Sequence, residues 1–78
     1  MTITWFCYYD SPDRVCHARL PDGCIVGTCR YTICCGWECW LSTGNYRCIG
    51  KGFTTRDEAH KFFEDNWQTI DAEDRLSG

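Results

Sequence analysis

Apolar residues recur at helical spacing near the end of the chain, where five of them form one stripe about 140° wide. The stripe consists of Ala59, Phe62, Phe63, Trp67 and Ile70. Thr55 precedes the stripe and Glu58 follows three residues later, which is the pattern of a capping box at a helix start. The pattern predicts an amphipathic helix over residues 54–70 and a frayed acidic tail over residues 71–78.

The first 53 residues instead show short β-prone runs that turn-forming residues separate. The turn signals are Ser11-Pro12-Asp13, Pro21-Asp22-Gly23 and Ser42-Thr43-Gly44-Asn45. The strands that they delimit cover residues 2–9, 14–20, 24–35, 36–41 and 46–53. We therefore expect one α+β domain over residues 1–78. Its cysteine-rich antiparallel sheet of four to five strands would occupy residues 1–53, with the C-terminal helix packed on one face.

A weak internal repeat relates two of the expected hairpins. Trp5-Phe6-Cys7 followed by Cys16 matches Trp37-Glu38-Cys39 followed by Cys48, with the same spacing in both copies. In each hairpin a short loop would place the two cysteines directly opposite each other. Opposed residues of antiparallel strands have Cα atoms about 4.5–5.5 Å apart, which a disulfide can bridge.

Eight cysteines in 78 residues leave three chemical states open. The opposed pairs could form disulfides, or the cysteines could be buried free thiols that act as small apolar residues. Alternatively, both pairs could converge on one zinc ion. The ligands would then be Cys7, Cys16, Cys39 and Cys48. Zinc is the one cofactor that the sequence suggests.

Charge and length narrow the class of protein. The chain has 8 Lys and Arg against 11 Asp and Glu, a formal net charge of −3, which argues against a generally basic nucleic-acid binder. No stretch approaches the roughly 18 apolar residues of a membrane span. The N-terminus has neither the basic nor the apolar region of a secretion signal. We therefore expect a cytoplasmic location in a bacterium or an infected host, with a secreted disulfide-bonded mini-protein as the alternative.

Candidate catalytic residues are few. No catalytic triad, carboxylate pair or phosphate-binding loop stands out, and Gly50-Lys51-Gly52 is too short for a dinucleotide motif. His17 and His60 could each ligate a metal or activate a cysteine thiol, although ordinary positions in a sheet and at a helix edge explain both. We therefore expect a protein that is not an enzyme.

Aromatic residues fall on both faces of the expected sheet, because Trp5 and Cys7 alternate with Phe6 and Tyr8. The repeat assigns Trp5 and Trp37 to the core. The other face is then predicted to bind a partner or to be covered in a dimer. Its candidate residues are Phe6, Tyr8, Arg30, Trp40 and Arg47. Aromatic rings with arginine are typical of protein hot spots and of surfaces that stack on single-stranded nucleic acid.

The helix offers a second surface, because Glu64 and Asp65 lie away from its apolar stripe among other acidic residues. Such acids could meet a basic partner or mimic nucleic-acid phosphates. The small size, the acidic charge and the sparse motifs favour an interaction protein that binds and inhibits or modulates a macromolecular partner. A nucleic-acid-processing complex is the expected kind of partner. In size and charge the chain resembles phage and mobile-element inhibitors, anti-CRISPR proteins among them.

The junction between the last expected strand and the helix carries Gly50, Phe53, Thr55, Glu58 and Ala59. With one residue inserted after the glycine, residues 37–67 resemble the strand-to-helix part of AP2-type and phage-integrase arm-binding domains. The resemblance implies a three-stranded antiparallel sheet followed by a helix, with a sheet that reads the major groove of DNA. By match, the sheet residues would be Arg30, Glu38, Trp40, Arg47 and Lys51. A nucleic-acid-binding domain of this type, stabilised by zinc, is the alternative function, although the acidic charge and the cysteines depart from the family.

Overall fold

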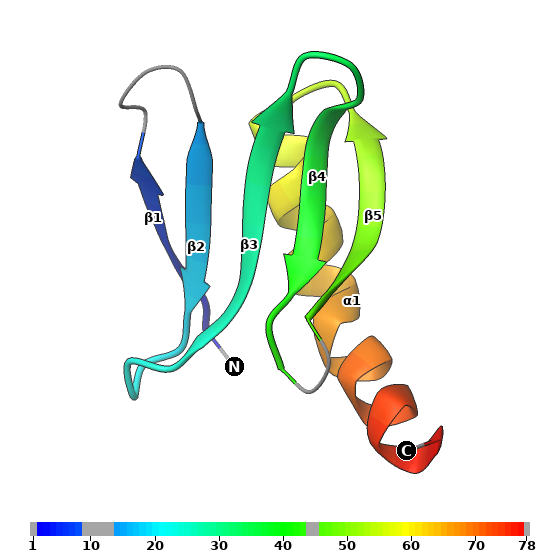
Figure 1. Ribbon diagram of the computed structural model, residues 1–78. Helices are drawn as coiled ribbons and strands as arrows, with labels where there is room; N and C mark the ends of the chain where they lie inside the picture. Colours follow the sequence, from blue (N-terminus) through cyan, green and yellow to red (C-terminus); the bar gives the residue numbers. More distant parts are fainter. Residues whose placement is uncertain (1, 9–13, 44–45, 78) are drawn as a thin grey trace.

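A computed structural model describes residues 2–8, 14–43 and 46–77 of the chain. The elements follow one another as β1 (Thr4–Tyr8), β2 (Val15–Arg19), β3 (Ile25–Thr32), β4 (Gly36–Leu41), β5 (Arg47–Phe53) and α1 (Arg56–Ser77) (Figure 1). The predicted α+β fold, a five-stranded antiparallel sheet with one C-terminal helix packed against it, is confirmed. Within the described residues, no helix has the length and apolar character needed to cross a membrane.

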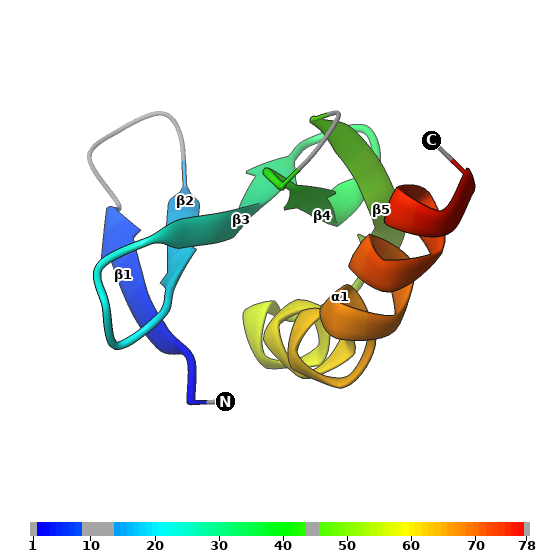
Figure 2. The same cartoon turned by 90° about the horizontal axis from the view of Figure 1, so that it is seen from below.

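The strand order in the sheet is β1-β2-β3-β4-β5, and every neighbouring pair is antiparallel. Helix α1 packs against β3, β4 and β5, while the hairpin of β1 and β2 extends past the side of the helix (Figure 2). The register shifts between Ala18 and Arg19, and again within the β4–β5 pair near Cys39. One face of the sheet is therefore covered by the helix over three of its five strands.

The core lies between this face and the apolar stripe of α1. Ala59, Phe63 and Trp67 of the helix are buried there, as the stripe predicted. The sheet contributes Cys16, Ala18, Val26, Cys29, Trp37, Cys39 and Leu41. A Cβ on Gly27 would overlap the ring of Phe63, so the absence of a side chain at Gly27 lets this phenylalanine seat against the sheet. Trp37 is buried and Trp5 packs against the core, as the repeat predicted.

The helix start agrees with the predicted capping box, because the backbone N–H of Glu58 donates to Thr55 Oγ1 at 3.2 Å. The helix end does not agree with the prediction. The residues expected to form a frayed tail are helical as far as Ser77. Arg75 pairs with Asp71 one turn earlier, and Arg47 of β5 holds Asp74 in an ion pair. The Arg75–Asp71 pair supports the last turns of the helix internally, and the Arg47–Asp74 pair holds them against the sheet.

Candidate binding face and cysteine–histidine cluster

The face of the sheet opposite α1 is formed by the residues that alternate with the core positions. Phe6 pairs with His17, His17 with Thr28, and Thr28 with Trp40, so these side chains form one row across four strands. The neighbouring row joins Tyr8, Val15, Arg30 and Glu38. We call this surface the open face and define it by Phe6, Tyr8, His17, Arg19, Arg30, Glu38 and Trp40. No helix among the described residues covers it (Figure 2).

Two arginines on the open face lie over aromatic rings. The guanidinium carbon of Arg19 is 4.3 Å from the ring centroid of Phe6, and that of Arg30 is 5.2 Å from the ring of Trp40. Glu38 Oε1 accepts from Arg30 Nε at 3.1 Å and from Trp40 Nε1 at 3.3 Å. These contacts fix the side chains before any partner arrives, which lowers the entropy lost on binding.

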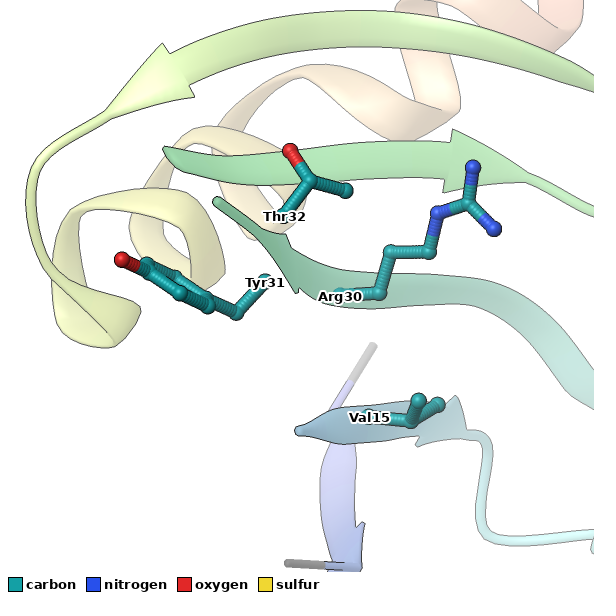
Figure 3. A pocket seen from close by; sticks show the side chains of 4 residues that line it. All are labelled: Val15, Arg30, Tyr31 and Thr32. Carbon is teal, nitrogen blue, oxygen red and sulfur yellow. The ribbon is translucent and has the colours of Figure 1, made fainter. Parts of the chain in front are cut away.

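The remaining open-face aromatic residue, Tyr8, and the neighbouring Tyr46 are more exposed than Phe6 and Trp40. Tyr8 is 53% exposed and packs its ring edge against His17, with centroids 5.8 Å apart. His17 Nδ1 lies 3.2 Å from Thr28 Oγ1, so this histidine takes part in the sheet surface. Tyr46 stacks on Trp40 with centroids 5.1 Å apart. A small pocket borders the face where β2 begins and β3 ends, lined by Val15, Arg30, Tyr31 and Thr32 (Figure 3).

The structure thus brings Phe6, Tyr8, Arg30 and Trp40 to one face, as predicted, but it places Arg47 elsewhere. Arg47 pairs with the core residue Leu41 instead of Trp40, because the connection between β4 and β5 is one residue longer than predicted. Its side chain reaches α1, where Nη2 and Nε donate to the two carboxylate oxygens of Asp74 at 2.7 and 3.1 Å. The hydrogen bonds from Arg47 to Asp74 raise the pKa of the Arg47 guanidinium. The predicted position of Arg47 on the open face is therefore wrong.

Two residues of the open face were not predicted from the sequence to lie there. Arg19 and His17 alternate with the buried Cys16 and Ala18 along β2, and this alternation is the signal that points them to the open face. The acidic pair Glu64 and Asp65 is exposed on α1, and its predicted contact with a partner stays a prediction.

On the covered face, four cysteines stand side by side across β1 to β4. Cys7 is opposite Cys16, Cys16 opposite Cys29, and Cys29 opposite Cys39. Cys7 and Cys16 form a disulfide, as one of the open alternatives for this pair suggested. The Sγ atoms of Cys29 and Cys39 lie 3.2 Å apart, and Cys39 Sγ donates to the carbonyl oxygen of Ala59 at 3.1 Å. Hydrogen bonding to Cys39, together with burial, raises the pKa of the Cys29 thiol.

The second predicted cysteine pair is wrong. Cys48 is opposite Trp40 of the other face, because the connection between β4 and β5 is one residue longer than predicted. A β-bulge between Trp40 and Cys39 then places Cys39 opposite Gly50. The four-cysteine zinc site is consequently not assembled in the described structure. The group of described residues that could hold a metal is Cys7, Cys16 and His60.

The ligand atoms of Cys7, Cys16 and His60 all lie within 4.8 Å of one another. Trp5 stacks on the imidazole of His60, with ring centroids 3.8 Å apart. The Nε2 atom of His60 is buried and has no hydrogen-bond partner among the described residues. Burial lowers the pKa of His60 to about 4, so the imidazole is neutral at pH 7. While the disulfide is intact, its sulfurs are not thiolate ligands.

Three other cysteines are exposed. Cys34 and Cys35 lie in the turn between β3 and β4, with Sγ atoms 3.3 Å apart, and Cys24 precedes β3. Hydrogen bonding to Cys34 raises the pKa of the Cys35 thiol. These thiols are accessible to reagents that cannot reach the covered face.

Comparisons with protein-family models, with curated proteins and with solved structures give no match. The resemblance of residues 37–67 to AP2-type and integrase arm-binding domains therefore stays a prediction. Three antiparallel strands followed by a helix are present as β3, β4, β5 and α1.

Proposed function

We propose that this chain is a non-enzymatic interaction protein that binds a protein partner through the open face of its sheet and inhibits or modulates that partner. The observation that carries the proposal is the double pairing of arginine with an aromatic ring, Arg19 over Phe6 and Arg30 over Trp40, on an uncovered face. Tryptophan, tyrosine and arginine are the residue types that dominate binding hot spots.

The charges favour a protein over a nucleic acid as partner. Binding to phosphates gains affinity from cations that release counterions, whereas this chain carries a net charge of −3. On the open face, Glu38 already engages Arg30. Glu64 and Asp65 on the far side of α1 would repel nucleic acid and attract a basic protein surface. We favour as partner a nucleic-acid-processing complex of the kind that phage and mobile-element inhibitors, including anti-CRISPR proteins, act upon.

The alternative is a nucleic-acid-binding domain of AP2 or integrase-arm type. One observation favours it: Arg30 and Trp40 lie on the uncovered face of the three-strand-and-helix part of the fold. Under either function, zinc would bind only in the reduced chain, when Cys7 and Cys16 are thiols. A cytoplasmic location stays part of the proposal, while the disulfide favours the secreted alternative, because such bonds persist in oxidising compartments.

Photo-crosslinking tests which surface binds. A benzophenone amino acid in place of Tyr8 reports on the open face, and the same group in place of the exposed Lys61 of α1 is the matched control. We expect the Tyr8 position to crosslink a defined host protein that mass spectrometry identifies. With that protein purified, Trp40→Ala with Arg30→Ala should weaken binding at least tenfold, as truncation of a hot spot does. Glu64→Gln with Asp65→Asn should have a smaller effect.

Three results would contradict the proposal. Crosslinks from Lys61 alone would move the interface to the helix. Crosslinks between two copies of this chain would make the open face a dimer interface. Salt-dependent binding of purified DNA that Arg19→Glu abolishes would support the alternative.

A further inference from the structure

A small cluster of side chains forms part of the contact between the N-terminal hairpin and the helix. Helix α1 packs against β3, β4 and β5, whereas β1 and β2 lie to the side of it (Figure 2). Trp5 of β1 reaches the helix by stacking on His60 and placing its ring edge against Phe63, with the Trp5 and Phe63 centroids 5.6 Å apart. Directly beside this stack lie the sulfurs of Cys7 and Cys16. Side chains from two strands and one helix therefore converge at the cluster.

Two buried ring nitrogens at this junction, Trp5 Nε1 and His60 Nε2, lack a hydrogen-bond partner among the described residues. His60 Nε2 is buried without a hydrogen bond among the described residues, and a buried polar group left in this state is destabilising. Sulfur ligands lie close by, since a ring nitrogen of His60 and the Sγ atoms of Cys7 and Cys16 are all within 4.8 Å of one another. Around a tetrahedral zinc ion, sulfur and nitrogen ligands lie roughly 3.5–3.8 Å apart, given bonds of about 2.0–2.3 Å. Small side-chain rotations would bring the three atoms to that spacing.

We propose that Cys7, Cys16 and His60 form a zinc site that is available only when the Cys7–Cys16 disulfide is reduced. A dithiol reductant supplies two electrons and two protons to the two sulfurs, and is itself oxidised to a disulfide. Zn²⁺ then displaces both thiol protons, which pass to solvent. Two thiolates and the neutral imidazole give the sulfur and nitrogen donors that zinc prefers, and a water molecule completes four ligands.

The disulfide-bonded state and the zinc-bound state link different elements of the fold. The disulfide joins β1 to β2, whereas zinc would join both strands to α1 through His60. Reduction followed by zinc binding thus replaces a link inside the hairpin with a link between the hairpin and the helix. This site does not depend on the function proposed for the open face, and its failure would leave that function untouched.

Zinc titration tests the site in a chain with Cys24→Ser, Cys34→Ser and Cys35→Ser, which removes the exposed thiols that would also bind metal. The chain is reduced with a phosphine, freed of metal, and titrated with Zn²⁺ against a chromophoric chelator. We expect one Zn²⁺ per reduced chain, with release of two protons, and none per oxidised chain. Co²⁺ in place of Zn²⁺ should give a thiolate charge-transfer band of a tetrahedral site.

His60→Gln separates this site from other thiol sites. Loss of an outer-shell partner lowers metal affinity roughly 10- to 100-fold, so loss of the direct ligand His60 should lower it at least as much. The matched control, Cys29→Ala with Cys39→Ala, removes the neighbouring thiol pair and should leave the affinity within a few-fold. Thermal unfolding of each metal-free variant reports whether it is folded.

A measurement on the reduced chain with its native histidines completes the test. The ring nitrogen resonances of His60 should shift on addition of Zn²⁺ while those of His17 stay in place. The proposal would be overturned by zinc binding of equal strength in the oxidised chain. It would equally fail if zinc bound without moving the His60 resonances, or if the Cys29 and Cys39 variant abolished binding.

Discussion

Trp5 and His60 stack face to face, with ring centroids 3.8 Å apart and ring planes 5° apart, and so tie the first strand to the helix. Because Trp5 also packs against Phe63, its removal opens the junction between the hairpin and the rest of the fold. We expect Trp5→Ala to lower the free energy of unfolding by about 2–3 kcal/mol, less than for a fully buried tryptophan. Urea unfolding measures this, with Thr4→Ala at an exposed neighbouring position as the control. A loss below about 0.5 kcal/mol would show that the stack contributes little.

Lowering the pH should reduce the free energy of unfolding of the oxidised, metal-free protein because of His60. Its pKa is lowered to about 4, chiefly by burial, with a further lowering by Arg56 and an opposing effect of Asp57. The unfolded chain, with a histidine pKa near 6.5, binds the proton more readily than the folded chain. The contribution of neutral His60 to the free energy of unfolding is therefore complete above about pH 6.5 and is lost as the pH falls toward 4. We expect His60→Gln to flatten the loss of stability between these pH values. An unchanged pH profile in His60→Gln would contradict the burial of this imidazole.

Gly27→Ala should be strongly destabilising, because the new Cβ would overlap the ring of Phe63 and approach the Trp40 carbonyl oxygen. Overpacking of this kind typically costs about 1–3 kcal/mol. Phe63→Leu, which withdraws the ring, should make the added Gly27→Ala change less harmful than it is in the parent chain. A double-mutant cycle by chemical denaturation measures this coupling, and additive effects would disprove the contact.

Cysteine alkylation should separate the exposed free thiols from the fully buried ones. Cys24, Cys34 and Cys35 are exposed and should react with iodoacetamide in the native protein. Cys29 and Cys39 are fully buried, and the raised pKa of Cys29 keeps it a thiol, so both should react only when the chain unfolds. Mass spectrometry of peptides after timed alkylation distinguishes the classes. Equal rates at Cys29 and Cys34 would contradict the covered position of the cysteine row.

Arg47→Ala should loosen the end of α1 without affecting partner binding. Arg47 holds Asp74 through two hydrogen bonds, so its loss should raise the rate of amide hydrogen exchange in residues 71–77. The start of the helix, capped by Thr55, should exchange as before. Altered partner affinity with unchanged hydrogen exchange in this variant would instead indicate that Arg47 belongs to the binding surface.

Much of this fold can be predicted from local sequence patterns. The predictions that are wrong concern strand register and contacts between elements. Alternation in the strands and the stripe in the helix were sufficient for the five strands and for the face that α1 covers. The pairing of Cys39 with Cys48 failed because the connection between β4 and β5 is one residue longer than predicted, so that Trp40 pairs with Cys48. The same one-residue difference pairs Arg47 with Leu41 and so places it on the helix side of the sheet.

The extent of the helix and the metal-ligand group depended on contacts between distant segments. Nothing in residues 71–77 alone shows that Arg47 will hold Asp74. Likewise, His60 was recognised as a possible ligand, but its neighbours Cys7 and Cys16 belong to the opposite end of the chain. Such contacts arise only when packing brings the elements together.

The strand order β1-β2-β3-β4-β5 repeats the order of the chain, and this has a consequence for how the protein folds. Each strand pairs only with its neighbours in sequence, so sheet assembly closes short loops, and such low contact order is associated with fast folding. Contacts between the sheet and α1 are less local, and the stack of Trp5 on His60 joins segments near opposite ends of the chain. We therefore expect β3, β4, β5 and α1 to form early, and the docking of the N-terminal hairpin onto the helix to complete the native state.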